Sequence, residues 1–468
     1  MNSTLKLPRV VLVAGGGVSG RGCAAILREL GTEVTVADGN PQTREELSST
    51  LGVKTVDPEE VDFSESNFDL VVTSPGWRPN SPLLRQAAES QLEVIGDVEL
   101  AWRLDQAEVF GTPRRWLVVT GTNGKTTTTG MLAAMMQANE AESGLRAAAA
   151  GNIGVSLFTA LAAQPRVDIL CVELSSFQLH WSNTLRPDVG VVLNLAEDHI
   201  DWHGSFEAYA HDKAKALLGK VAIIGKDDPH VVDSAIKIRP SGVVTSFSAG
   251  EPQDGGVGVI GTDIVVGNPP QRVASATGIE PVGIAGVLDA CAAAAVAHAA
   301  GASAEAISAG LASYRVDAHR GEIVHDAASV KFIDNSKATN PHAADAALAG
   351  LSNVIWIAGG QLKGAEVDDL IAAHHNSMKA VVLLGQDRDM IAASLNKHAP
   401  ALALEIIDDN DGEEAMRRSV EAAIQHAEAG DTVLLAPAAA SLDMYSGMSE
   451  RGDLFAHFAR TLFQGEEL

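Results

Sequence analysis

The sequence predicts an α/β protein of three domains, each built on a parallel sheet. Three observations lead to this fold class. An apolar run followed by glycines and a helical stretch occurs near residue 10 and again near residue 116. Strand-like and helical stretches alternate once more after residue 330, and a length of 468 residues is enough for about three domains with their own cores. We place these domains at residues 1–112, 113–317 and 318–468.

Composition limits the partners of this chain. A net charge of −26 argues against nucleic acid, because no extended basic surface would neutralise a phosphate backbone. Three cysteines, Cys23, Cys171 and Cys291, stand singly in apolar segments and indicate reduced core residues. We expect no signal peptide and no membrane span, since the longest apolar run, 283–301, contains Asp289 and His298. The expectation is a cytoplasmic monomer without nucleic-acid or membrane partners.

The first domain is predicted from a strand at 9–14, a turn with Gly15, Gly17 and Gly20, and a second strand at 31–38 that ends in Asp38. This is the outline of a Rossmann fingerprint, in which a helix N-terminus approaches a diphosphate and the acid takes a ribose or base edge. A diphosphate is common to NAD, FAD and UDP-sugars, so the pattern alone does not choose between them. A further strand at 68–76 ends in a Ser74-Pro75-Gly76 turn at the edge where such sheets bind ligands.

The central domain begins with a strand at 116–119, a glycine loop and a helix over 131–136. Free backbone N–H groups, the helix dipole and the Lys125 ammonium would converge on phosphate oxygens, and the Thr126 hydroxyl can ligate Mg²⁺. Val119 stands where the general phosphate-loop pattern has its first glycine. A tight turn before a threonine-rich helix is the alternative interpretation.

Two polar groups follow strands beside that loop. Glu173 follows the strand 168–172, and His199 lies just beyond the strand 189–194. Either alone would suit a loop residue or a helix cap, but together at neighbouring strand ends they favour metal binding. Residues 236–282 predict a small antiparallel β element, and 283–301 a helix.

The third domain is predicted as a second parallel, doubly wound sheet with strands at 330–334, 354–358, 380–384, 403–407 and 432–436. Polar loops at 335–340, 359–363 and 440–443 follow three of these strands. Their Ser, Thr and Asn residues also suit helix caps, worth about 1 kcal/mol each. Lys337 and Lys363 instead suit an anionic ligand with carboxylates.

Four strings carry a resemblance to a known family: Gly121-Thr122-Asn123-Gly124-Lys125-Thr126-Thr127, Gly151-Asn152-Ile153-Gly154, the run from Glu173 to Leu179, and Glu197-Asp198-His199. In this order they resemble the Mur ligase superfamily, the ATP-dependent amide ligases of peptidoglycan precursor synthesis. The Glu173 run is most similar to its D-glutamate-adding branch. The resemblance covers nearly the whole chain and implies UDP-N-acetylmuramoyl-L-alanine, D-glutamate, ATP and two Mg²⁺ ions as ligands.

The resemblance also implies roles for individual residues. Catalysis falls to Lys125, Glu173, His199 and Lys213, and metal binding to Thr126, Glu173, His199 and a carbamylated Lys213, with Lys215 as its less well aligned neighbour. The ATP set is Gly121, Thr122, Asn123, Gly124, Lys125, Thr126, Thr127, Arg320 and Lys337. The UDP-substrate set is Gly17, Val18, Ser19, Asp38, Gly39, Ser74, Asn152 and Ser175. The D-glutamate set is Thr339, Lys363, Ser441 and the amide of Leu442.

The chain departs from the family pattern at two single positions and in the order of one residue pair. Gly286 and Asp289 stand where the family has Asn in a helix that contacts adenine, so the adenine contacts are not assigned. Asp334-Asn335 replaces the commoner order Asn-Asp, which affects the ribose contact.

The expected chemistry is activation of a carboxylate by the ATP γ-phosphoryl group, followed by attack of an amine on the acyl phosphate. Two other classes explain part of the sequence. A nicotinamide oxidoreductase would use the first glycine turn and Asp38 but leave the Gly124-Lys125-Thr126 loop without a role. A regulatory NTPase would use that loop but neither the first domain nor the lysines of the third. Within the superfamily, the amino acid added could also differ.

Overall fold

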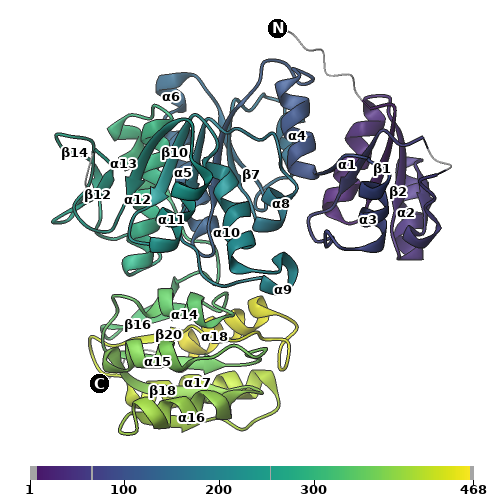
Figure 1. Ribbon diagram of the computed structural model, residues 1–468. Coiled ribbons are helices and arrows are strands. Elements are labelled where there is room, and N and C mark those ends of the chain that lie inside the picture. The colour runs from purple at the N-terminus through teal and green to yellow at the C-terminus, as the bar shows by residue number, and fades with distance from the viewer. Residues whose placement is uncertain (1–7, 65–66, 253–254, 464–468) are drawn as a thin grey trace. The chain divides into compact units, whose positions relative to one another are not determined.

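The computed structural model describes residues 8–64, 67–252 and 255–463, and the chain divides into two compact units (Figure 1). The first unit comprises Met1–Ser275 and Asp289–Ser313, and the second comprises Ala276–Leu288 and Tyr314–Leu468. Three sheets, of five, nine and six strands, form the framework of the chain, and the first two belong to the first unit. The α/β fold class is thereby confirmed. The boundaries at 112 and 317 stay predictions.

The five-stranded sheet is fully parallel and has the order β3-β2-β1-β4-β5. Its strands are β1 (Val10–Ala14), β2 (Glu33–Ala37), β3 (Lys54–Val56), β4 (Leu70–Thr73) and β5 (Val94–Gly96). The helices between and after them are α1 (Val18–Glu29), α2 (Pro41–Leu51), η1 (Pro58–Glu60), α3 (Pro82–Glu89) and α4 (Asp97–Gln106). This strand order is that of a Rossmann-like sheet, as predicted.

The nine-stranded sheet has the order β14-β13-β12-β11-β10-β9-β6-β8-β7. Its strands are β6 (Arg115–Thr120), β7 (Ala147–Gly151), β8 (Ile169–Glu173), β9 (Val189–Val192), β10 (Val221–Gly225), β11 (Val243–Phe247), β12 (Val257–Ile260), β13 (Asp263–Val266) and β14 (Gln271–Ser275). β6 pairs in parallel with β8 on one side and β9 on the other. The segments that follow these three strands therefore leave the same edge of the sheet next to one another.

Ten helices of the described chain accompany this sheet. They are α5 (Lys125–Ala138), α6 (Glu140–Ser143), α7 (Leu157–Ala162), α8 (Ser176–His180), α9 (Ile200–His203), α10 (Phe206–Ala214), η2 (Lys215–Leu217), α11 (Pro229–Ile238), α12 (Ile284–Ala299) and α13 (Ala304–Ser313). Helix α12 agrees with the prediction for 283–301 and contributes residues to both compact units. One hydrophobic cluster joins the five-stranded and nine-stranded parts of the first unit, and in it Trp102 meets Trp116 edge to face at 5.4 Å.

The small antiparallel element predicted for 236–282 is only partly correct. Strands β12, β13 and β14 pair antiparallel, but β11 pairs in parallel with β10 along its whole length. A single parallel pair, Phe247 with Val257, joins β11 to β12. The segment is therefore an extension of the main sheet, because β11 continues the parallel pairing of β10 and one further pair joins β12 to it.

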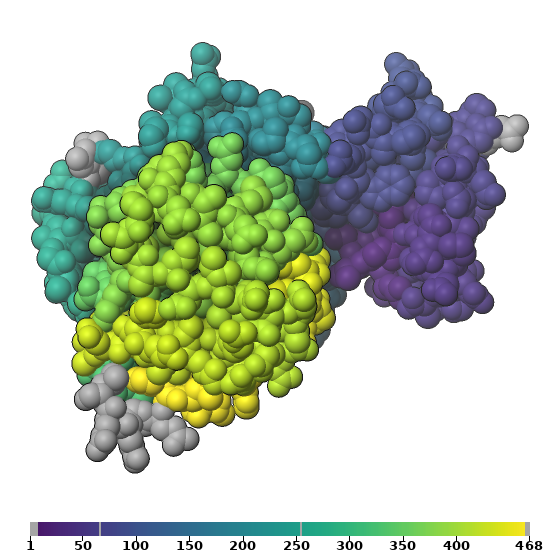
Figure 2. All heavy atoms as spheres, turned by 90° about the horizontal axis from the view of Figure 1, so that it is seen from below, coloured from purple at the N-terminus to yellow at the C-terminus, as the bar shows by residue number. Residues whose placement is uncertain are grey.

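The second unit holds the six-stranded sheet, of order β15-β16-β20-β17-β18-β19. Its strands are β15 (Glu322–Ala327), β16 (Val330–Asp334), β17 (Val354–Gly359), β18 (Met378–Leu384), β19 (Ala403–Ile406) and β20 (Thr432–Leu435). Its helices are α14 (Pro341–Leu348), α15 (Asp368–His374), η3 (His375–Ser377), α16 (Arg388–His398), α17 (Gly412–His426) and α18 (Met448–Leu462). Figure 2 shows the green and yellow surface of this unit.

The third sheet is parallel in the five predicted strands and has one further strand at its edge. The five predicted strands are parallel, but β15 was not expected and pairs antiparallel with β16. Alternate residues of β17 enter two different cores, Ile355 and Ile357 one of them and Trp356 and Ala358 the other. Both faces of the sheet are thus covered, which is why its strands are continuous apolar runs.

Among the described residues, no helix combines the length and apolar character needed to cross a membrane.

Candidate active site

The phosphate loop, residues 121–126, connects β6 to α5 as the sequence predicted. Gly124 caps α5 with φ of +80°, and a Cβ there would lie 2.2 Å from Oδ1 of Asp289. Asn194, which follows β9, holds the loop from the side. Its backbone oxygen accepts from the N–H of Thr122 at 2.9 Å, and its Oδ1 accepts from the N–H of Asn123 at 2.8 Å. These two hydrogen bonds hold the loop against the end of β9.

Two lysines converge on one carbonyl of this loop. Nζ of Lys125 donates to the oxygens of Gly121 and Thr122 at 3.0 and 2.7 Å, and Nζ of Lys213 donates to the same Gly121 oxygen at 2.6 Å. Lys213 is buried, with its Nζ 4.9 Å from the centre of the Tyr209 ring. Burial and the nearby charge of Lys125 hold the pKa of Lys213 well below its usual value. The Lys125 ammonium beside this loop favours an anionic ligand.

Glu173 provides the carboxylate next to these lysines. It ends β8 and is 1% exposed. Its Oε2 accepts from the Thr126 hydroxyl at 2.9 Å, and its Oε1 accepts from the side-chain amide of Asn152 at 2.8 Å. A buried carboxylate and a hydroxyl at hydrogen-bond distance form a set of oxygen donors that suits a hard cation such as Mg²⁺.

His199 begins α9 with φ of +54°, a left-handed conformation that is uncommon for a residue with a side chain. Its Nε2 lies 3.4 Å from Oδ2 of Asp198, and its ring lies 4.7 Å from that of Phe177. Burial lowers the pKa of His199, which favours the neutral imidazole that ligates metals.

A cavity of about 570 Å³ within the first unit is lined by Lys125, Asn152, His199 and Lys213, whereas Thr126 and Glu173 are not among its wall residues. Predicted site residues on its wall are Val18, Ser19, Lys125, Asn152, Ser175, His199 and Lys213. The wall thus combines the N-terminus of α1 with the phosphate loop and the strand ends of the nine-stranded sheet. Val18 is 87% exposed at this wall.

Asp97 is a wall residue that the sequence did not single out. It is buried at the start of α4, accepts a hydrogen bond from the Ser19 side chain, and has a pKa raised by burial. Asp97 reaches the wall because α4 packs near α1, and no local sequence motif predicts that packing.

Four predicted substrate residues, Gly17, Asp38, Gly39 and Ser74, lie outside the residues that line this cavity. Both carboxylate oxygens of Asp38 accept backbone N–H groups, from Gly16 at 2.7 Å and from Asn40 at 2.8 Å. The Ser74 hydroxyl donates to the Gly15 oxygen at 3.4 Å. Asp38 and Ser74 thus fix the glycine turn after β1.

The second unit carries Lys337, Thr339, Lys363, Ser441 and Leu442 on loops that follow β16, β17 and β20, and it carries Arg320 just before β15. Ser441 is buried, whereas Lys363 and Leu442 are exposed, and Lys363 has φ of +55°. The N–H of Lys337 donates to the oxygen of His319 at 3.1 Å, and Nδ1 of His319 contacts the buried Asp334 at 2.6 Å. Arg320 adjoins His319 in the chain.

One buried arginine connects the three loops. Arg451, in α18, donates to both the hydroxyl and the backbone oxygen of Ser336, at 3.0 and 2.8 Å. It also donates to the oxygens of Ala439 and Gly359 at 3.2 and 3.4 Å. Sequence analysis did not identify this residue as part of the site. Its only signal is an arginine at 1% exposure, which cannot be recognised before the fold is known.

Comparison with known families agrees with this arrangement. Residues 119–260 match the Mur ligase middle domain, and residues 319–439 match the Mur ligase glutamate ligase domain. Residues 3–98 match the alanine dehydrogenase/PNT C-terminal domain, in keeping with the Rossmann-like sheet. Fold and site therefore define the class of the Mur ligases.

Relatives with a known function narrow the position of the chain within this class. A UDP-N-acetylmuramoylalanine–D-glutamate ligase of Corynebacterium diphtheriae is 54% identical over 95% of this chain and 94% of the relative. The enzyme of the same name from Nocardia farcinica is 43% identical over 98% of both chains. The chain belongs to the Mur ligase family, and the predicted similarity to the D-glutamate-adding branch is confirmed.

Solved structures show the same fold at lower identity. The MurF ligase of Thermotoga maritima in complex with ADP aligns with a TM-score of 0.58 at 15% identity, covering 92% of this chain and 95% of that one. A pseudomurein peptide ligase type C from Methanothermus fervidus aligns with a TM-score of 0.55 at 18% identity, covering 97% and 100%.

Proposed function

We propose that this chain joins D-glutamate to UDP-N-acetylmuramoyl-L-alanine with hydrolysis of ATP to ADP and phosphate, in peptidoglycan precursor synthesis. The observation that carries the proposal is the convergence of Lys125 and Lys213 on the phosphate loop beside buried Glu173, in a chain 54% identical to a ligase of that name. The alternative of a nicotinamide oxidoreductase would leave Lys125, Lys213 and Glu173 without a function.

The reaction needs an activated carboxylate, because a free carboxylate is a poor electrophile at neutral pH. Transfer of the γ-phosphoryl group to the L-alanine carboxylate makes an acyl phosphate, with ADP as the leaving group. The amine of D-glutamate then attacks the carbonyl carbon, phosphate leaves, and the amine proton passes to solvent or a base. The Lys125 ammonium stabilises the charge on the phosphoryl oxygens during the transfer.

The proposed metal ligands are Thr126, Glu173, His199 and Lys213, which is carbamylated in this proposal. The hydroxyl and carboxylate oxygens around Glu173 fit Mg²⁺, and bound Mg²⁺, expected as two ions, would neutralise negative charge on phosphate. Lys213 is suited to carbamylation because its lowered pKa favours the neutral amine, whose nitrogen bonds to the carbon of CO₂ with release of a proton. The resulting carbamate replaces a cationic group with oxygen ligands.

The UDP end of the substrate is assigned to the first unit, through Gly17, Val18, Ser19, Asp38, Gly39, Ser74, Asn152 and Ser175. The cavity wall supports Val18, Ser19, Asn152 and Ser175 in particular. ATP is assigned to residues 121–127 with Arg320 and Lys337, and D-glutamate to Thr339, Lys363, Ser441 and the Leu442 amide. The anchoring of their loops by Arg451 supports a site that is shaped in advance.

We also propose a cytoplasmic monomer with the domain ranges given above. Three free, buried cysteines are consistent with a reducing compartment.

The test is phosphate release from ATP and Mg²⁺ with UDP-N-acetylmuramoyl-L-alanine, comparing D-glutamate with L-glutamate, meso-diaminopimelate and no amino acid. Release that requires both the UDP substrate and D-glutamate is the expected result. Phosphate release with another amino acid would support the same mechanism with a different amino-acid specificity. Phosphate release without either substrate would instead support a regulatory NTPase.

Carbamylation is tested separately with ¹³C-labelled bicarbonate. The wild-type chain is expected to show a carbamate carbon signal that Lys213→Met lacks. A matched variant, Lys215→Met, should keep the signal. A signal lost only in Lys215→Met would assign the modification to that neighbour instead.

A further inference from the structure

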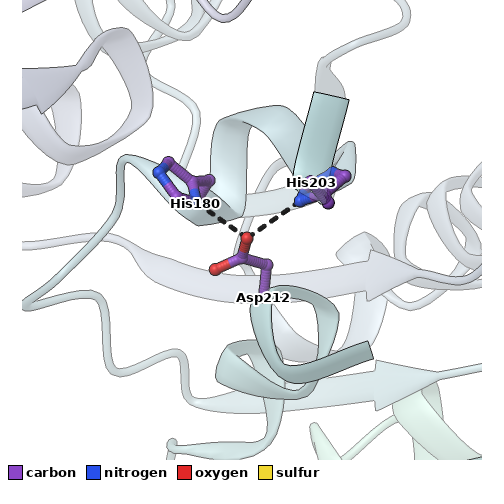
Figure 3. A group of neighbouring side chains, drawn as sticks. All are labelled: His180, His203 and Asp212. Carbon is purple, nitrogen blue, oxygen red and sulfur yellow. Dashed lines mark hydrogen bonds and ion pairs between the residues drawn. The ribbon is translucent and has the colours of Figure 1, made fainter. Parts of the chain in front are cut away.

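Three helices that adjoin the candidate active site bring two histidines and an aspartate together (Figure 3). His180 ends α8, His203 ends α9, and Asp212 lies in α10. Nδ1 of His180 and Nδ1 of His203 lie 2.7 and 3.1 Å from the same atom, Oδ2 of Asp212. The ligand-capable atoms of all three residues lie within 4.8 Å of one another.

We propose that His180, His203 and Asp212 form a binding site for a transition-metal ion of the zinc type. The ion would bind Nδ1 of each imidazole and Oδ2 of Asp212. Two imidazoles and one carboxylate are a ligand set that zinc uses, with a fourth position left for water. This donor set differs from that around Glu173, where a carboxylate and a hydroxyl favour a hard cation. The inference does not depend on the proposed ligase activity.

The outer contacts of the three residues have the pattern of a metal site. Nε2 of His203 lies 3.0 Å from the Ser176 hydroxyl, an outer contact that fixes the orientation of the imidazole ring. Lys215 lies 3.0 Å from Oδ1 of Asp212, the oxygen that the ion would not use. Its ammonium also donates to the oxygens of Leu179 and His180, so it is held on the far side of the carboxylate.

Two of the three side chains are buried and held in place, and the third is partly exposed, so a metal ion could reach the site from solvent. The side chains of His203 and Asp212 are 0% and 7% exposed, whereas that of His180 is 30% exposed. The ring of His203 is held at 5.6 Å from that of Phe177 and at 5.4 Å from that of Tyr209. An ion would thus meet two fixed ligands and one on the open side. A hydrogen-bonded network without metal is the competing explanation, and it predicts no metal spectrum.

The experiment uses Co²⁺ as a spectroscopic probe on the full chain, with Mg²⁺ in large excess to occupy sites that prefer hard cations. We expect one equivalent of Co²⁺ to give the visible absorption of a four-coordinate nitrogen and oxygen site, and Zn²⁺ to displace it. His180→Gln and His203→Gln should abolish this band. Ser176→Ala, which removes an outer partner, should weaken binding by about 10- to 100-fold.

Matched controls separate this site from other histidines. His211→Gln, an exposed residue next to Asp212, and His199→Gln, at the proposed Mg²⁺ site, should both keep the band. Zn²⁺ should also raise the melting temperature of the wild-type chain but not that of His180→Gln. The His180 side chain is partly exposed, so we expect this variant to fold. The proposal is overturned if no band forms, or if His180→Gln and His203→Gln bind Co²⁺ as His211→Gln does.

Discussion

Lys213 is the residue whose environment is hardest to explain by stability alone. Its ammonium is buried, lies near Lys125 and has a pKa held well below the usual value by burial and by that charge. Between its folded pKa and about 10.5, the unfolded chain binds more protons at this residue than the folded chain does. Lys213 therefore destabilises the fold at neutral pH, and its destabilising effect decreases as the pH rises.

We predict that Lys213→Met raises the free energy of unfolding of the ligand-free chain by on the order of 1 kcal/mol while reducing phosphate release at least about 100-fold. The Gly121 oxygen keeps its bond to Lys125 in this variant. Calorimetry in bicarbonate-free buffer from pH 6 to 9 should show the gain shrinking toward high pH. The exposed Lys54→Met serves as the control. A Lys213→Met chain less stable than wild type at every pH would contradict the argument.

At the scale of elements, helix α18 holds three loops of the second unit through Arg451. We predict that Arg451→Met raises the KM for D-glutamate at least about 10-fold, because the loops that carry Thr339, Lys363 and Ser441 lose a shared anchor. The KM for the UDP substrate, assigned to the first unit, should change less than about twofold. The expected loss of stability is about 1–3 kcal/mol for each buried oxygen left without a donor.

The matched control for this anchor is Arg460→Met. Arg460 lies on the same helix, is exposed, and donates to the Val324 oxygen at 3.0 Å, away from the three loops. Equal increases in both KM values for Arg451→Met would show a general loss of folded protein and count against a positioning role.

The start of α5 allows a second prediction at this scale. Gly124→Ala should abolish detectable nucleotide binding by calorimetry, because the added Cβ meets Asp289 at 2.2 Å and φ is +80°. In the double variant with Asp289→Ala the clash is relieved, and only the left-handed strain of about 1–2 kcal/mol remains. Binding should therefore return in part. A double variant no better than Gly124→Ala would mean that the clash is not the cause.

The local pattern of apolar and polar residues predicts most of the helices and strands, but it predicts few of the contacts between them. The strands at 10–14, 115–120 and 354–359 contain continuous apolar runs, so sequence alone predicts them. Strand β15 was missed because Glu322, His325 and Asp326 interrupt its apolar residues, as an edge strand permits. Asp97, Arg451 and the His180 group depend on pairings between distant segments, and nothing in the neighbouring sequence encodes those.

The family resemblance compensates for part of this gap at the candidate site. The phosphate loop, Glu173 and Lys213 were predicted as separate motifs, and the structure brings them together around the Gly121 oxygen and the Thr126 hydroxyl. What motifs do not report is the state of each side chain. The carboxylate of Asp38 is engaged by backbone N–H groups, and that of Glu173 by Thr126 and Asn152.

At the scale of the whole molecule, each compact unit has hydrophobic clusters of its own among the described residues. The core around Val118 and Trp116 belongs to the first unit, and the two cores around β17 belong to the second. Helix α12 is the element that contributes to both. Separate cores allow the units to unfold at different temperatures, because each buries its own apolar surface.

We therefore predict two calorimetric transitions in the ligand-free chain and a ligand-specific response of each. UDP-N-acetylmuramoyl-L-alanine at about 100 times its Kd should stabilise only the transition of the first unit, by about 2.7 kcal/mol, since all its proposed contacts lie there. D-Glutamate alone should shift only the other transition. Arg451→Met identifies the second unit, because it should lower that transition and leave the first unchanged. A single transition that both ligands shift equally would show that the units unfold together and would contradict this assignment of substrates to units.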